Sequence, residues 1–210
     1  MPAPVDTLRY RENRATTPRF RTGMPADTRS SRTAAMRVEN SRLELSGVAF
    51  RDLLGSALGF SNSALVASDC SFEVSATSAG AAVPIVTGSG FAGDNPVVFR
   101  GNRFSAIDRA APVFVFDGQG QLGAWLELRG NRFWGGAREA VELSGCNSFL
   151  WENRFQNFRH PESPAKRTAV VSINGISAGA WPSAVLAHNR LGQADGGHRT
   201  RMLHVLRNMK

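Results

Sequence analysis

One short phrase recurs along this chain and constrains its fold more than any other feature. It consists of an apolar residue, a short polar stretch, and then Asn-Arg followed by an aromatic residue or leucine. Four clear copies end at Phe104, Phe133, Phe155 and Leu191, and weaker copies end at positions 50 and 72. Self-similarity at intervals of a few tens of residues is typical of solenoids, propellers and other repeat architectures.

A second phrase, a short apolar strand, alternates with the first. It covers residues 57–60, 82–86, 112–116, 140–143, 169–173 and 202–205. β-Branched and aromatic residues dominate these segments, and turn-forming Gly, Ser, Asn, Asp and Pro separate them. No amphipathic helical stretch intervenes, and the intervals are too short for four-stranded propeller blades. The sequence therefore predicts an all-β chain, a parallel β-helix whose rungs each contain two or three short strands.

The rung phrase, as in residues 101–104 and 152–155, resembles the repeat of the pectin-lyase-like superfamily. The resemblance covers about residues 38–208 and implies a single-stranded parallel β-helix of about six rungs. The resemblance and the general preference for right-handed crossovers both imply a right-handed coil. That superfamily includes lyases, glycosidases, adhesins and proteins without known chemistry, so the fold alone does not determine a function.

The first 37 residues differ from the rest of the chain. They show neither a helical nor a strand period and carry eight arginines against three acidic residues, within a total net charge of +8. We predict that residues 1–37 form a basic, disordered or loosely packed arm and that residues 38–210 form the β-helix. Such an arm binds an acidic surface or is a solvated extension. Nucleic acid is the less favoured partner, because no known nucleic-acid-binding motif accompanies the arm.

Alternation of side chains along a strand predicts where the residues of the phrase point. The aromatic residues point inward, and the asparagines two positions earlier, Asn102, Asn131, Asn153 and Asn189, form a structural ladder along the coil. The arginines between them, Arg103, Arg132, Arg154 and Arg190, point outward in a row. Stacked like charges repel. Either acids such as Glu127 and Glu152 neutralise the row or an anionic ligand binds along it; a solubilising stripe is the alternative.

The sequence predicts no catalytic residues, no metal site and no cofactor. Residues 117–120, Asp-Gly-Gln-Gly, resemble a phrase of polygalacturonase-type glycosidases, but the other phrases of those enzymes are missing, so we interpret this one as a turn. The four histidines lack metal-ligand spacing. Cys70 and Cys146 lie about three rungs apart, too far for a disulfide, and are predicted to be unpaired core residues.

These patterns favour a non-catalytic β-helix scaffold or binding module for an extended anionic partner, with an acidic polysaccharide as the first candidate. One alternative is a polysaccharide lyase or glycosidase that acts on pectin-like sugars, and a second is a segment of a larger surface or adhesin-type protein. Residues 203–210 offer no obvious polar cap, so an end-to-end assembly partner or a missing flanking domain is a further expectation. No apolar run is long enough to span a membrane as a helix. No secretory signal is recognisable, and the compartment stays open.

Overall fold

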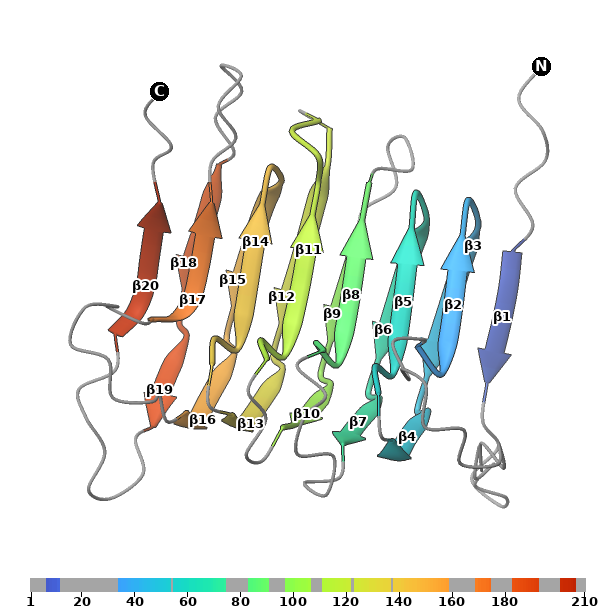
Figure 1. The fold of residues 1–210 in the computed structure, drawn as a ribbon, viewed down its shortest axis with the longest axis horizontal. Helices are drawn as coiled ribbons and strands as arrows, with labels where there is room; N and C mark the ends of the chain where they lie inside the picture. Colours follow the sequence, from blue (N-terminus) through green and yellow to red (C-terminus); the bar gives the residue numbers. More distant parts are fainter. Residues whose placement is uncertain are drawn as a thin grey trace.

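The computed structural model describes residues 7–11, 34–53, 55–74, 83–90, 97–106, 111–121, 123–136, 138–158, 169–174, 183–192 and 201–206. Within these ranges the chain forms short strands and no helix, and the strands pair in parallel in three sheets (Figure 1). The described residues therefore contain no helix long and apolar enough to cross a membrane.

Each sheet runs along the whole length of the coil. Sheet A contains, in spatial order, β1 (Thr7–Arg11), β3 (Arg42–Ser46), β6 (Ala64–Ser68), β9 (Val97–Arg100), β12 (Trp125–Arg129), β15 (Asn147–Trp151) and β18 (Ala184–Ala187). Sheet B contains β2 (Met36–Glu39), β5 (Leu58–Ser61), β8 (Val86–Ser89), β11 (Phe114–Asp117), β14 (Val141–Ser144), β17 (Ala169–Asn174) and β20 (Arg201–Leu206). Sheet C contains β4 (Ala49–Leu53), β7 (Ser71–Val74), β10 (Arg103–Ser105), β13 (Arg132–Gly136), β16 (Arg154–Phe158) and β19 (Arg190–Gly192).

The chain visits the sheets in the order B, A, C and then repeats. Six three-stranded coils run from β2–β3–β4 to β17–β18–β19, and β20 begins another. Each strand pairs in parallel with the strand of the same sheet in the next coil, which confirms the predicted parallel β-helix of about six rungs. Its right-handedness stays a prediction.

The two sequence phrases correspond to different parts of a coil. The short apolar phrase overlaps the strands of sheet B, closely at β11 and β14 but by one residue, Val86, at β8. The Asn-Arg-Phe phrase covers the end of a sheet A strand, a corner and the start of a sheet C strand, as from β9 into β10. The Asn-Arg-Phe repeat of the sequence is therefore largely the repeat of this corner.

The core contains a column of stacked rings contributed by sheet C. Neighbouring rings have centroids 4.7–5.1 Å apart and planes within 19° of parallel, in the order Phe50, Phe72, Phe104, Phe133 and Phe155. All five are buried. Phe99 of sheet A and Phe114 of sheet B pack edge to face beside the column, with centroids 4.9 Å apart. The prediction that the rings stack inside the coil is confirmed.

Both cysteines are buried and unpaired, as predicted. Burial in the apolar interior raises the pKa of Cys70 to about 11 and that of Cys146 to about 12. Both therefore stay thiols at neutral pH and act as small core residues.

Part of the predicted arm is a strand. Thr7–Arg11 forms β1, which pairs in parallel and in register with Arg42–Ser46 of β3. The strand β2 begins at Met36, close to the predicted boundary at residue 37. Residues 12–33 of the arm lie outside the described residues, so the division into arm and β-helix stays a prediction.

Candidate binding groove at a corner of the coil

Each coil turns sharply between sheets A and C at a residue with positive φ. These corner positions are Gly47, Asp69, Gly101, Gly130, Glu152 and His188, with φ between 54° and 68°. All six are exposed. The left-handed conformation suits glycine, and Asp and His tolerate it better than most other residues. The residue after each corner position points back into the coil, and in the last four coils that residue is asparagine.

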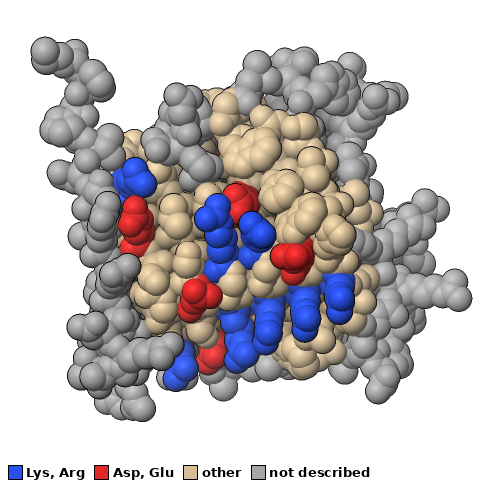
Figure 2. All heavy atoms as spheres, turned by 180° about the vertical axis from the view of Figure 1, so that it is seen from behind, with Lys and Arg blue, Asp and Glu red and all other residues tan. Residues whose placement is uncertain are grey.

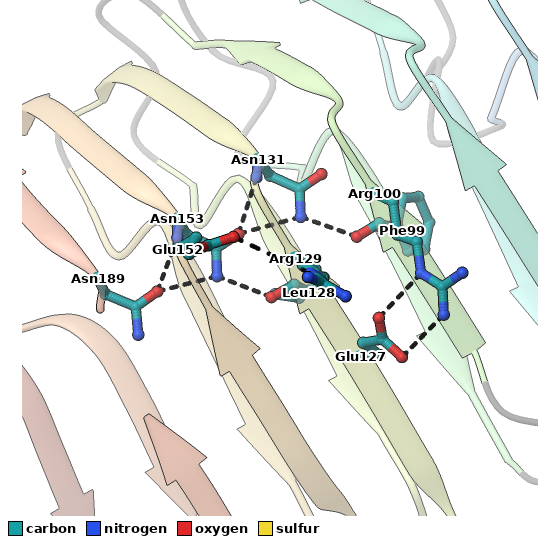
Figure 3. Close-up of polar contacts among 9 residues, drawn as sticks. All are labelled: Phe99, Arg100, Glu127, Leu128, Arg129, Asn131, Glu152, Asn153 and Asn189. Atoms are coloured by element: carbon teal, nitrogen blue, oxygen red, sulfur yellow. Dashed lines mark hydrogen bonds and ion pairs between the residues drawn. The ribbon is translucent and has the colours of Figure 1, made fainter. Parts of the chain in front are cut away.

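The asparagines form the predicted ladder (Figure 3). Asn102, Asn131 and Asn153 are fully buried, and Asn189 is half-buried. The Oδ1 of Asn131 accepts hydrogen bonds from the backbone N–H and the Nδ2 of Asn102, at 2.9 and 3.0 Å. The same pair of bonds joins Asn131 to Asn153 and Asn153 to Asn189. Each Nδ2 also donates to a carbonyl of sheet A, for example from Asn131 to Phe99 at 2.9 Å. The ladder thus fixes the backbone at the corner.

The residue after each ladder asparagine points outward, which produces the arginine row: Arg103, Arg132, Arg154 and Arg190. These residues are paired with one another in the register of sheet C, and all four side chains are exposed. Figure 2 shows basic side chains gathered in a line along this face. The row begins at Arg103, because Ser71 and Ala49 occupy the same slot in the two earlier coils.

The nearby acids pair with a second set of arginines on sheet A. Glu127 accepts hydrogen bonds from Arg100 at 2.9 and 3.2 Å, and this bidentate contact raises the pKa of Arg100 above its ordinary value. An oxygen of Glu152 lies 4.0 Å from Nε of Arg129 (Figure 3). Among the residues that the structure describes, no carboxylate forms an ion pair with the arginine row. Glu127 and Glu152 thus pair with Arg100 and Arg129 and not with the row. This differs from one of the two predicted alternatives, in which these acids neutralise the row.

A groove of about 410 Å³ lies between the corner positions and the arginine row. We call it the corner groove. Three successive coils line it with two residues each, Gly130 with Arg132, Glu152 with Arg154, and His188 with Arg190. Because the coils stack along the axis at about 4.8 Å per strand, the groove runs parallel to the coil axis. The ring of His188 lies edge-on against the indole of Trp151, with centroids 4.6 Å apart.

The roles of Glu152 and His188 in this groove were missed by the sequence reasoning, although a signal was present. Both residues occupy the slot directly before the ladder asparagine, which is filled by Gly101 and Gly130 in the two coils before them. The sequence repeat contains this slot, but only the folded coil shows that the residue there has a positive φ and points outward.

The other candidate groups form no site in the part of the chain described. Oδ1 of Asp117 accepts a hydrogen bond from the backbone N–H of Gln119 at 2.9 Å, and Gln119 has φ 55°, so this phrase forms a turn. Burial raises the pKa of Glu142, and the charge of Glu139 adds to the effect. No group of three or more His, Cys, Asp or Glu among the described residues is arranged to hold a metal ion.

Comparisons with protein-family models, curated proteins and solved structures gave no match to this chain. The parallel β-helix fold thus rests on the structure itself.

Proposed function

We propose that this protein is a non-catalytic binding module whose corner groove holds an extended polyanion, an acidic polysaccharide. One observation carries the proposal. The acids near the corner pair with Arg100 and Arg129 of sheet A, while the four arginines of the row have no carboxylate partner among the described residues. An anionic ligand would supply the missing counter-charge.

The geometry of the row suits a linear ligand. Each of the last four coils contributes one guanidinium group at the same position in the register, so successive cations are spaced at about 4.8 Å along a straight line. A guanidinium group binds a carboxylate with two parallel hydrogen bonds, which fixes the orientation of the anion as well as its position. An extended chain with regularly spaced carboxylates matches this arrangement, whereas a compact anion would contact only one or two coils.

The resemblance of the rung phrase to the pectin-lyase-like superfamily makes polyuronates the first ligands to test. The alternative, a lyase or glycosidase, receives no specific support. Glycoside hydrolysis uses two facing carboxylates, and among the described residues that line the groove Glu152 is the one carboxylate. Membership of a larger surface or adhesin-type protein is compatible with the same groove and stays a prediction.

The proposal is tested by titrating the protein with polygalacturonate, alginate and a neutral glucan over a series of salt concentrations. We expect both polyuronates to bind and the glucan not to bind. Affinity should fall as salt rises, because exposed charges are screened within about 8 Å at physiological ionic strength. Reducing ends and unsaturated products, followed in parallel, should stay at background.

The decisive variant replaces Arg132 and Arg154 by Gln. Its control replaces Arg37 and Arg51 by Gln. These two arginines lie outside the groove, where Arg37 pairs with Glu39 and Arg51 pairs with Glu73. Both double variants remove two positive charges, so a loss of affinity confined to the first assigns binding to the row. Equal binding by both variants, or negligible binding of every polymer, would refute the proposal. Released sugar would favour the enzyme alternative.

A further inference from the structure

A carboxylate lines a groove whose other charged groups are cationic. Glu152 is exposed, and its ion pair with Arg129 is long, at 4.0 Å between Oε2 and Nε. Around the same pocket lie Arg132, Arg154 and Arg190. In a site built only to attract polyanions, a carboxylate at this position would oppose binding.

Glu152 is not required by the fold. Its φ of 57° lies in the left-handed region, which disfavours a residue with a long side chain. Glycine fills the same slot in the two preceding coils, at Gly101 and Gly130, and forms the same corner there. A glycine at position 152 would therefore give an equally good or better corner. Asp69 and His188 also fill this slot without glycine, but Glu152 has the longest aliphatic stem of the three and its strain points to a role outside the fold.

The chemistry of the two kinds of side chain indicates what that role is. Guanidinium groups only donate hydrogen bonds, and an ionised carboxylate only accepts them. A ligand that satisfies both must carry anionic acceptors and hydrogen-bond donors side by side, and the carboxylate and hydroxyl groups of a uronic acid do so. A polymer with carboxylates and no hydrogen-bond donors would meet the arginines equally well but would be repelled by Glu152.

We propose that Glu152 is a specificity residue, which accepts a hydrogen bond from a ligand hydroxyl next to the carboxylate held by the arginine row. This inference rests on the proposed function and adds the ligand class: a polyanion that carries hydroxyl groups. Glu152 thereby discriminates against polyanions that carry charge alone.

The experiment compares polygalacturonate with polyacrylate of similar length and charge, at one ionic strength; polyacrylate carries carboxylates and no hydrogen-bond donors. Wild-type protein should prefer polygalacturonate by about tenfold, the effect expected of one partly exposed charge-assisted hydrogen bond. In Glu152→Gly, affinity for polygalacturonate should fall and affinity for polyacrylate should rise, so that the preference largely disappears.

The matched control is Asp69→Gly. Asp69 occupies the same corner position with φ 54°, is exposed and lies outside the groove, so the change removes the same charge from a left-handed corner and likewise places glycine there. The preference should be unchanged in this variant, and neither substitution should lower the thermal midpoint.

The outcomes separate the two proposals. If neither polymer binds the wild-type protein, the proposed function fails and this inference fails with it. If both polymers bind and Glu152→Gly leaves their ratio as it was, the proposed function stands and the role of Glu152 is refuted. Tighter binding of poly(U) than of polygalacturonate would refute the acidic polysaccharide of the proposed function, in favour of a nucleic-acid ligand.

Discussion

At the scale of the residue, a substitution in the middle of the asparagine ladder should destabilise the protein more than one at its end. The side chain of Asn131 accepts two hydrogen bonds from Asn102 and donates to the Phe99 carbonyl and to Asn153. Asn131→Ala leaves buried groups unsatisfied, at about 1–3 kcal/mol for each group. Asn189 is half-buried, and water can replace its side chain, so Asn189→Ala should cost less. Urea denaturation of both variants measures the difference; equal losses would contradict a buried ladder.

A second residue-scale prediction concerns pH. Burial raises the pKa of Glu142, with a further contribution from Glu139, so the native state holds this proton more tightly than the unfolded state does. Glu142 therefore lowers stability as pH rises through the window between its unfolded and its raised native pKa. Glu142→Gln should raise the thermal midpoint at pH 7–8. The gap from wild type should close at low pH, where the wild-type carboxyl is protonated. A gap that is constant with pH would show that ionisation is not its cause.

At the scale of the element, the sequence predicted strands wherever the pattern repeated strictly. The alternation around Asn-Arg-Phe gave the inward rings and the outward arginines, and the apolar phrase gave the strands of sheet B. Sheet A was not separated from the corner that follows it, because the repeat phrase runs from the last residues of a sheet A strand directly into sheet C, as from β9 into β10. The pairing of Glu127 with Arg100 joins neighbouring coils, and a linear pattern does not contain that register.

The packing of sheet B supplies an element-scale prediction. Phe60, Gly88 and Phe116 occupy one inward position in three successive coils, and the two rings stack across the glycine with centroids 5.9 Å apart. A Cβ at Gly88 would collide with the ring of Phe60 and lie 2.7 Å from Cδ2 of Phe116. Gly88→Ala should lower the free energy of unfolding by roughly 1–3 kcal/mol, the usual cost of overpacking, although alanine restricts the unfolded chain more than glycine does.

The control for this prediction is Gly59→Ala, in the neighbouring strand. Gly59 is half-buried, and a Cβ there would meet one atom, Cβ of Ala34 at 3.3 Å. Its effect should be small. If chemical denaturation gives the two variants the same stability, the stacking of Phe60 and Phe116 does not require glycine at position 88.

At the scale of the whole molecule, the arginine row should make stability depend on salt even without a ligand. Its neighbouring charges are separated by about 4.8 Å from strand to strand, which is less than the screening length of about 8 Å at physiological ionic strength. The repulsion is therefore strong at low salt and weak at high salt. The exposed ion pairs elsewhere, such as Arg37 with Glu39, respond in the opposite direction and contribute little each.

Replacing Arg132 and Arg154 by Gln isolates the contribution of the row. At low salt this double variant should melt about 1–3 °C above the wild-type protein, as expected when a few tenths to 1 kcal/mol of repulsion are removed from a chain of this size. The gap should shrink as sodium chloride is added.

The variant that lacks Arg37 and Arg51 removes the same charge but breaks two ion pairs, so it should melt at or below the wild-type temperature. Scanning calorimetry of the three proteins from low to high salt measures these gaps. If the row variant and the wild-type protein have the same melting temperature at every salt concentration, the row does not destabilise the folded protein electrostatically. The unpaired arginines would then be a solubilising stripe, with no need for an anionic ligand.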